Sequence, residues 1–128
     1  MAEINIRDLS IGDWVKASGV AKRVHSIDFQ NGEYFVHFSD PDTNSEDYLH
    51  APFVKPIPLT PEILEKNGIS KTYESDEYAV YKGEGFNVTE YYTELWEFER
   101  HRNRLMIRNV HQLQHALRLA GVEKEIEL

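Results

Sequence analysis

The chain has 128 residues, no cysteine and a formal net charge of -8 at neutral pH. The lack of cysteine excludes disulfides, thiolate zinc sites and cysteine nucleophiles, and the negative charge opposes binding to phosphate backbones and anionic lipid. Hydrophobic residues make up 41% and charged residues 28%, as in ordinary globular domains. The first eight residues lack the features of a secretory signal, and no apolar run reaches membrane-spanning length. We therefore expect a cytoplasmic protein that does not associate with membranes.

Short β-strands are predicted for the first half of the chain. Strands are expected at residues 11–15, 20–29 and 34–38, followed by a polar, acidic loop at 40–47 and one or two short strands within 48–57. Asn31-Gly32 predicts a tight hairpin turn because both residues tolerate positive φ. This pattern predicts a first subdomain, residues 1–58, with the fold of a small SH3-like β-barrel, and other five-stranded meanders fit it nearly as well.

The next segment carries signals for both ends of a short helix. Thr60 is suited to the N-cap, Pro61 to the first helical position, and Gly68 to the left-handed residue that follows a helix. We predict a helix over about 61–67.

The second subdomain, residues 59–128, is expected to combine this helix with antiparallel strands over about 70–108 and a helix over about 110–120. The strand region has a period of two, with Tyr78 and Val80 alternating against Ala79 and Tyr81, and Trp96 and Phe98 alternating against Glu97 and Glu99. Gly121 marks the end of the last helix. Its apolar residues share one face, so His111 and His115 are expected to point to solvent or to the other half of the molecule. The predicted fold class is α+β, mostly β.

His111 and His115 also have the i, i+4 spacing found in zinc metalloprotease helices. Gln112, however, stands where the glutamate that acts as general base is needed, and an amide cannot take a proton from a metal-bound water. We predict histidines without a native metal site, no cofactor and no assigned catalytic residue.

Residues 40–44 place oxygen ligands at the first, third and fifth positions of a calcium-binding EF-hand loop. Ser45 replaces the glycine of the turn, and Ala51 replaces the bidentate glutamate. A solvated acidic loop is the favoured interpretation.

Arg100, Arg102, Arg104 and Arg108 form the main basic concentration. They could contact phosphates, but in a hairpin turning near Arg102 they would instead form cross-strand ion pairs, with Arg104 opposite Glu97 or Glu99. We favour ion pairs and predict no direct nucleic-acid binding.

A set of aromatic residues in the first subdomain has two interpretations. They either build the core of the barrel or line a groove for proline-rich or methylated ligands. Trp14 and Tyr48 are the strongest candidates for a groove, and His111 and Gln114 are candidate polar contacts near the junction of the two halves. The full set comprises Trp14, Tyr34, Phe35, Phe38, Tyr48 and Phe53.

Two segments carry a resemblance to a protein family. The run Leu59-Thr60-Pro61-Glu62-Ile63-Leu64-Glu65-Lys66-Asn67-Gly68 and the later Val110-His111-Gln112-Leu113-Gln114 resemble a family of short uncharacterised bacterial proteins. Such proteins look like products of mobile or prophage-type gene clusters. The resemblance implies a similar order of elements and a role in binding another macromolecule, and it implies no catalytic residues.

Three functions compete. The first is a non-enzymatic interaction module with a protein partner of unknown identity and oligomeric state. The second is an acidic decoy that blocks a nucleic-acid-binding protein, which requires Glu74, Asp76, Glu77, Glu84 and Glu90 to share one exposed face. The third is a small enzyme with a carboxylate or histidine site.

Overall fold

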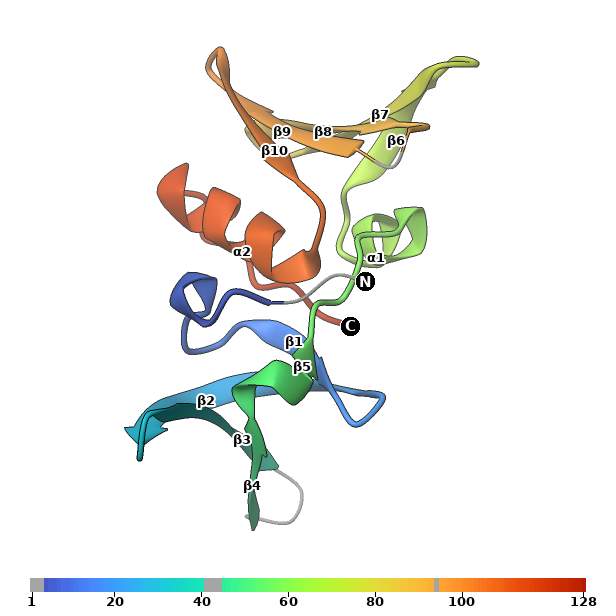
Figure 1. Cartoon of the computed structure of the whole chain (residues 1–128). Helices are drawn as coiled ribbons and strands as arrows, with labels where there is room; N and C mark the ends of the chain where they lie inside the picture. Colours follow the sequence, from blue (N-terminus) through green and yellow to red (C-terminus); the bar gives the residue numbers. More distant parts are fainter. Residues whose placement is uncertain (1–3, 41–44, 94) are drawn as a thin grey trace. The chain divides into compact units, whose positions relative to one another are not determined.

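The computed structural model describes residues 4–40, 45–93 and 95–128 (Figure 1). The protein is α+β and mostly β, with 49% of residues in strands and two α-helices in those ranges. It divides into two compact units, Met1–Ile57 and Pro58–Leu128. No helix in the described ranges is both long and apolar enough to span a membrane.

Unit Met1–Ile57 is built on one five-stranded antiparallel sheet of order β4-β3-β2-β1-β5. The last strand therefore returns to pair with the first. One-turn 3₁₀ helices precede β1 and β5 (Figure 1). The elements are η1 Ile6–Asp8, β1 Trp14–Ala17, β2 Val20–Gln30, β3 Glu33–Asp40, β4 Ser45–His50, η2 Ala51–Phe53 and β5 Val54–Lys55.

Strand β2 curls this sheet. Its first residues pair with β1, and its remainder pairs with β3 after a register shift between Val24 and Ser26. Such a bulge bends a strand and increases its twist. The buried cluster of the unit lies on one face of the curled sheet, and Val36 and Phe38 are its members from β3. The side chains that alternate with them on β3 therefore face outward.

The predicted hairpin at Asn31-Gly32 is confirmed, with φ of 52° and 80°. The strand predicted at 11–15 is wrong at its start, because residues 10–13 form a turn in which the Asp13 carboxylate accepts a hydrogen bond from the Ser10 amide at 2.8 Å. The loop predicted at 40–47 is also too long, since Ser45 already pairs with Asp40. Most of the calcium-type motif, residues 41–44, lies outside the described ranges.

Unit Pro58–Leu128 contains a five-stranded antiparallel meander of order β10-β9-β8-β7-β6 and two helices (Figure 1). Ala79 and Tyr81 are buried while Tyr78 and Val80 on the other face are half-buried, so the period-two prediction is confirmed. The elements are α1 Pro61–Lys66, β6 Ser70–Glu74, β7 Tyr78–Gly83, β8 Phe86–Tyr91, β9 Leu95–Arg100, β10 Asn103–Ile107 and α2 Val110–Leu119.

The capping residues predicted from the sequence are found at the start and end of α1 and at the end of α2. The Thr60 hydroxyl accepts a hydrogen bond from the Ile63 amide at 3.3 Å. Gly68 has φ of 76°, and the Ile69 amide donates to the Leu64 carbonyl at 2.9 Å. Gly121, with φ of 73°, allows the same closure after α2.

Candidate interaction site

The outward face of β3 and β4 carries a continuous row of aromatic and histidine rings, which we call the aromatic face. It comprises Phe35 and His37 from β3, Tyr48 and His50 from β4, and Phe53 from η2. Neighbouring ring centroids lie 5.6 Å apart for His37 and Tyr48, and 6.1 Å apart for Tyr48 and Phe35. The row continues from Phe35 to His50 at 5.2 Å and from His50 to Phe53 at 6.0 Å.

Strand register produces this row. Phe35 stands directly opposite His50, and His37 directly opposite Tyr48. Residues opposite each other on one face of an antiparallel pair are close enough for their side chains to touch. The four rings are therefore held by the backbone of two strands, which is a rigid way to present a binding surface.

Carboxylates lie beside both imidazoles of the aromatic face. The Asp28 Oδ2 atom is 2.7 Å from His37 Nε2, and the Glu33 Oε1 atom is 3.7 Å from His50 Nε2. Both carboxylate side chains are about half-exposed. The rings are thus bordered by acceptors that can bind a cationic group placed on the rings.

The aromatic face is open to solvent. Tyr48 is 65% exposed and Phe53 is 63% exposed. Beside His50 the surface is hollowed by a cavity of about 360 Å³, whose lining includes Glu33, Tyr34 and Pro52. Large exposed apolar groups next to a concave surface are a feature of binding sites.

The six aromatic residues singled out from the sequence occupy four different environments. Phe35, Tyr48 and Phe53 belong to the aromatic face. Phe38 is buried in the core, and Tyr34 packs against Phe29 with ring centroids 4.7 Å apart. Trp14 is half-buried on β1, where the Arg23 guanidinium carbon lies 5.0 Å from its ring centroid. The structure brings Tyr48, but not Trp14, into the ring contacts of this row.

Sequence reasoning overlooked His37 and His50 as members of the site. Their position could be found only by pairing β3 with β4 in the correct register, and the loop between these strands carries no turn signal as strong as Asn31-Gly32.

The sequence predicted that His111 and His115 point to solvent or to the other half of the molecule, and for His111 the solvent alternative is wrong. His111 is only 4% exposed, so it does not point to solvent, whereas His115 is half-buried and lies edge-on to it at 5.8 Å. Gln114 is also half-buried. Within the described ranges, no group of three or more metal-ligating side chains is close enough to hold a metal ion.

Gln112 has a structural role. Its Oε1 atom accepts hydrogen bonds from the Asn109 amide at 3.1 Å and the Arg108 amide at 2.7 Å. It therefore satisfies backbone donors at the start of α2, as the third residue of a capping box does. Helix capping accounts for this side chain without any metal chemistry.

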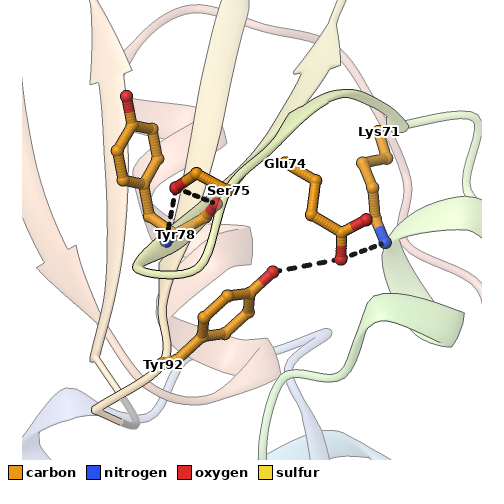
Figure 2. A network of polar contacts seen from close by, with 5 residues as sticks. All are labelled: Lys71, Glu74, Ser75, Tyr78 and Tyr92. Atoms are coloured by element: carbon orange, nitrogen blue, oxygen red, sulfur yellow. Dashed lines mark hydrogen bonds and ion pairs between the residues drawn. The ribbon is translucent and has the colours of Figure 1, made fainter.

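A polar network joins β6 to Tyr92, the residue that follows β8 (Figure 2). The Glu74 Oε1 atom accepts a hydrogen bond from the Tyr92 hydroxyl at 3.1 Å and lies 3.4 Å from Lys71 Nζ. Burial, followed by the hydrogen bond to Glu74, raises the pKa of Tyr92. Figure 2 also shows the Ser75 hydroxyl, which accepts from the Tyr78 amide at 3.3 Å and closes the turn between β6 and β7.

Glu90, which is half-buried, and Tyr81, which is buried, form a second polar pair in this unit. Burial is the largest effect on the Glu90 carboxyl and raises its pKa, while Lys71 and a hydrogen bond from Tyr81 lower it. Burial also raises the pKa of Tyr81 to about 12. Each of these groups has a partner that stabilises the fold, so the arrangement is explained without a substrate.

The five carboxylates required for an acidic decoy do not share a face. Glu74, Asp76 and Glu77 are exposed near the turn between β6 and β7. Glu84 lies in the turn at the other end of β7, and Glu90 is only half-exposed on the side of Tyr81. The described residues therefore do not form the single exposed acidic face that a decoy function requires.

The ion-pair interpretation of the arginines holds for Arg104. Its Nε atom lies 3.5 Å from Glu99 and 3.9 Å from Glu97, the two cross-strand partners expected from the sequence.

Comparisons with protein-family models, with curated proteins and with solved structures found no match to the chain.

Proposed function

We propose that the protein is a cytoplasmic interaction module whose first unit, an SH3-like barrel, binds a protein partner through the aromatic face. The return of β5 to β1 and the bent strand β2 support the SH3-like interpretation, since both curl a small sheet towards closure. The observation that carries the function is the continuous row of rings from His37 to Phe53, in which Tyr48 and Phe53 are exposed and the other three rings are half-buried.

The chemistry of the face favours a cationic side chain of the partner. An ammonium or guanidinium group over an aromatic ring gains about 0.5–1 kcal/mol at exposed sites and about 2 kcal/mol when desolvated. Tyr48 and Phe35 supply the rings, and Asp28 and Glu33 supply carboxylates at the border. An arginine, which is planar and donates in a fork, suits this combination best.

Single-stranded nucleic acid would also stack on aromatic rings. The carboxylates of Asp28 and Glu33 and the net charge of -8 would repel its phosphates, however. A basic peptide segment is therefore the better match. The predicted contacts His111 and Gln114 and the resemblance to short bacterial proteins stay predictions.

The test uses short peptides with several arginines in a glycine background, compared with the same peptides carrying citrulline in place of arginine. Citrulline keeps the planar shape but removes the charge. Binding to the full chain would be measured by fluorescence anisotropy and mapped by backbone amide chemical shifts. Tyr48→Ala is the main variant, and Tyr73→Ala, at another exposed strand tyrosine in the second unit, is its matched control.

We expect the arginine peptide to shift amides of β3 and β4, and Tyr48→Ala to weaken its binding about fivefold while Tyr73→Ala leaves it unchanged. Equal binding of the citrulline peptide would contradict recognition of a cation. Tighter binding of an oligouridylate than of the arginine peptide would instead assign the face to nucleic acid and overturn the proposal.

A further inference from the structure

The hairpin that joins β9 to β10 has an unusual turn. His101 and Arg102 form its two-residue loop and both have positive φ, of 49° and 70°. Three other two-residue hairpin loops occur in the ranges that the structure covers, and each has glycine at its second position: Ser18-Gly19, Asn31-Gly32 and Glu84-Gly85. Because a side chain with a Cβ atom is strained in this conformation, Arg102 lowers stability where glycine would not. Residues kept at a local cost to stability are candidates for a functional role.

Basic side chains are concentrated at this turn. Arg100, His101, Arg102 and Arg104 fall within five residues of a chain whose net charge is -8. Arg100 Nη1 donates a hydrogen bond to the Ala120 carbonyl at the end of α2, and Arg104 is paired with Glu99. These contacts hold both guanidinium groups in place beside the hairpin, while Arg102 is exposed at its tip.

An apolar cavity of about 440 Å³ lies beside Arg100, His101 and Arg104. Its apolar lining consists of Phe98 and Leu105 from the hairpin and Ala116 and Leu119 from α2, and its polar lining includes Arg100, His101 and Arg104. Leu105 is 44% exposed and Leu119 is 83% exposed, so the cavity is an open groove with an apolar wall. Its volume lies within the range of small-ligand sites.

We propose that this groove binds a free single-chain amphiphile with an anionic head group, of which a medium-chain fatty acid is the simplest. The alkyl chain contacts Leu105 and Leu119, and the carboxylate pairs with His101, which lines the groove. Arg102, the next residue of the same turn, adds an exposed positive charge beside His101. Charge complementarity selects the head group, since the turn is basic while the chain as a whole is acidic. The same overall charge repels an anionic bilayer, so the groove takes the free amphiphile and not a membrane surface.

The test measures calorimetric binding of decanoate to the full chain, below the concentration at which decanoate forms micelles. Decanol has an alkyl chain of the same length with an uncharged head group, and decyltrimethylammonium has one with a positively charged head group. Arg102→Gly removes the basic group and relieves the strained turn. Leu119→Asp places a carboxylate on the apolar wall at an exposed position. Lys82→Gln, which removes an exposed cation from another strand of the same unit, is the control.

We expect one decanoate to bind per chain, at least fivefold more tightly than decanol, with no binding of the ammonium compound. Arg102→Gly should raise the melting temperature by a few degrees and yet weaken decanoate binding at least fivefold. Leu119→Asp should abolish binding, and Lys82→Gln should not change it. Absence of saturable binding, equal affinity for all three amphiphiles, or unchanged binding in Arg102→Gly would overturn the proposal. So would association with anionic vesicles without binding of free decanoate.

Discussion

The buried phenol of Tyr81 should make the protein lose stability at alkaline pH, and Tyr81→Phe should remove that loss. Tyr81 has no exposed surface, and its pKa is raised from 10.0 to about 12, first by burial and then by the charge of Glu90. A raised pKa for an acid means that the folded state favours the protonated phenol. Its stabilising effect is therefore complete below pH 10 and is lost as the pH rises towards 12.

The size of the effect follows from the shift. A shift of about two pH units corresponds to about 3 kcal/mol, of which about half is lost by pH 11 and most by pH 12. At pH 8 the variant should be less stable than the wild-type protein by about 1–2 kcal/mol, because Glu90 loses a hydrogen-bond donor. The two stability curves should therefore cross at about pH 11, where the loss equals this deficit.

Urea denaturation followed by tryptophan fluorescence at pH 8, 10, 11 and 12 measures this difference. Tyr73→Phe removes a phenolic hydroxyl at a position that is 52% exposed, and it is the control for the same change at buried Tyr81. A constant difference in unfolding free energy between Tyr81→Phe and wild type across the whole range would refute the reasoning.

Three further substitutions test the local structure of the second unit. Gly83→Ala would place a Cβ atom within the ring of Phe86, which is 4% exposed, and should cost about 1–3 kcal/mol in urea denaturation; an unchanged midpoint would mean that the ring moves freely. Gln112→Ala removes the acceptor of the Arg108 and Asn109 amides and should lower the free energy of unfolding by about 1 kcal/mol. Gln112→Glu keeps an acceptor oxygen and should retain most of this stability. In the wild-type protein the Asn67 side chain donates to the Glu127 carbonyl at 2.8 Å and accepts from the Glu127 amide at 2.7 Å. Asn67→Ala removes both hydrogen bonds, so hydrogen exchange at the Glu127 amide should accelerate tenfold or more. Unchanged protection of this amide would show that other contacts hold the C-terminal segment.

Features set by neighbouring residues could be predicted from the sequence. Thr60 and Gly68 delimit α1, and Asn31-Gly32 makes a hairpin, because caps and tight turns depend on the φ preferences and hydrogen-bonding groups of a few adjacent residues. The period-two alternation around Tyr81 likewise predicted the strand, whereas tertiary packing decided that Tyr81 lies on its buried face. Local signals were less reliable at Ile11, where a nearby acceptor on Asp13 favours a turn over a strand.

The candidate sites could not be predicted from neighbouring residues, because they join residues that are distant in the sequence. His50 lies opposite Phe35 only because β3 and β4 pair in one register, and a shift of one residue would move every side chain to the other face. Likewise, nothing near Leu119 in the sequence indicates that the basic turn at Arg102 is beside it.

The amino-acid sequence by itself determined the caps, the turns, the alternation of the strands and the acidic charge, since each depends on interactions within a few residues. Tertiary structure alone decided which rings join into the aromatic face, that His111 is buried, and that a basic turn borders an apolar groove. The physical reason is that strand register and helix packing minimise the free energy of the whole core, and surface side chains are brought together as a consequence of that packing.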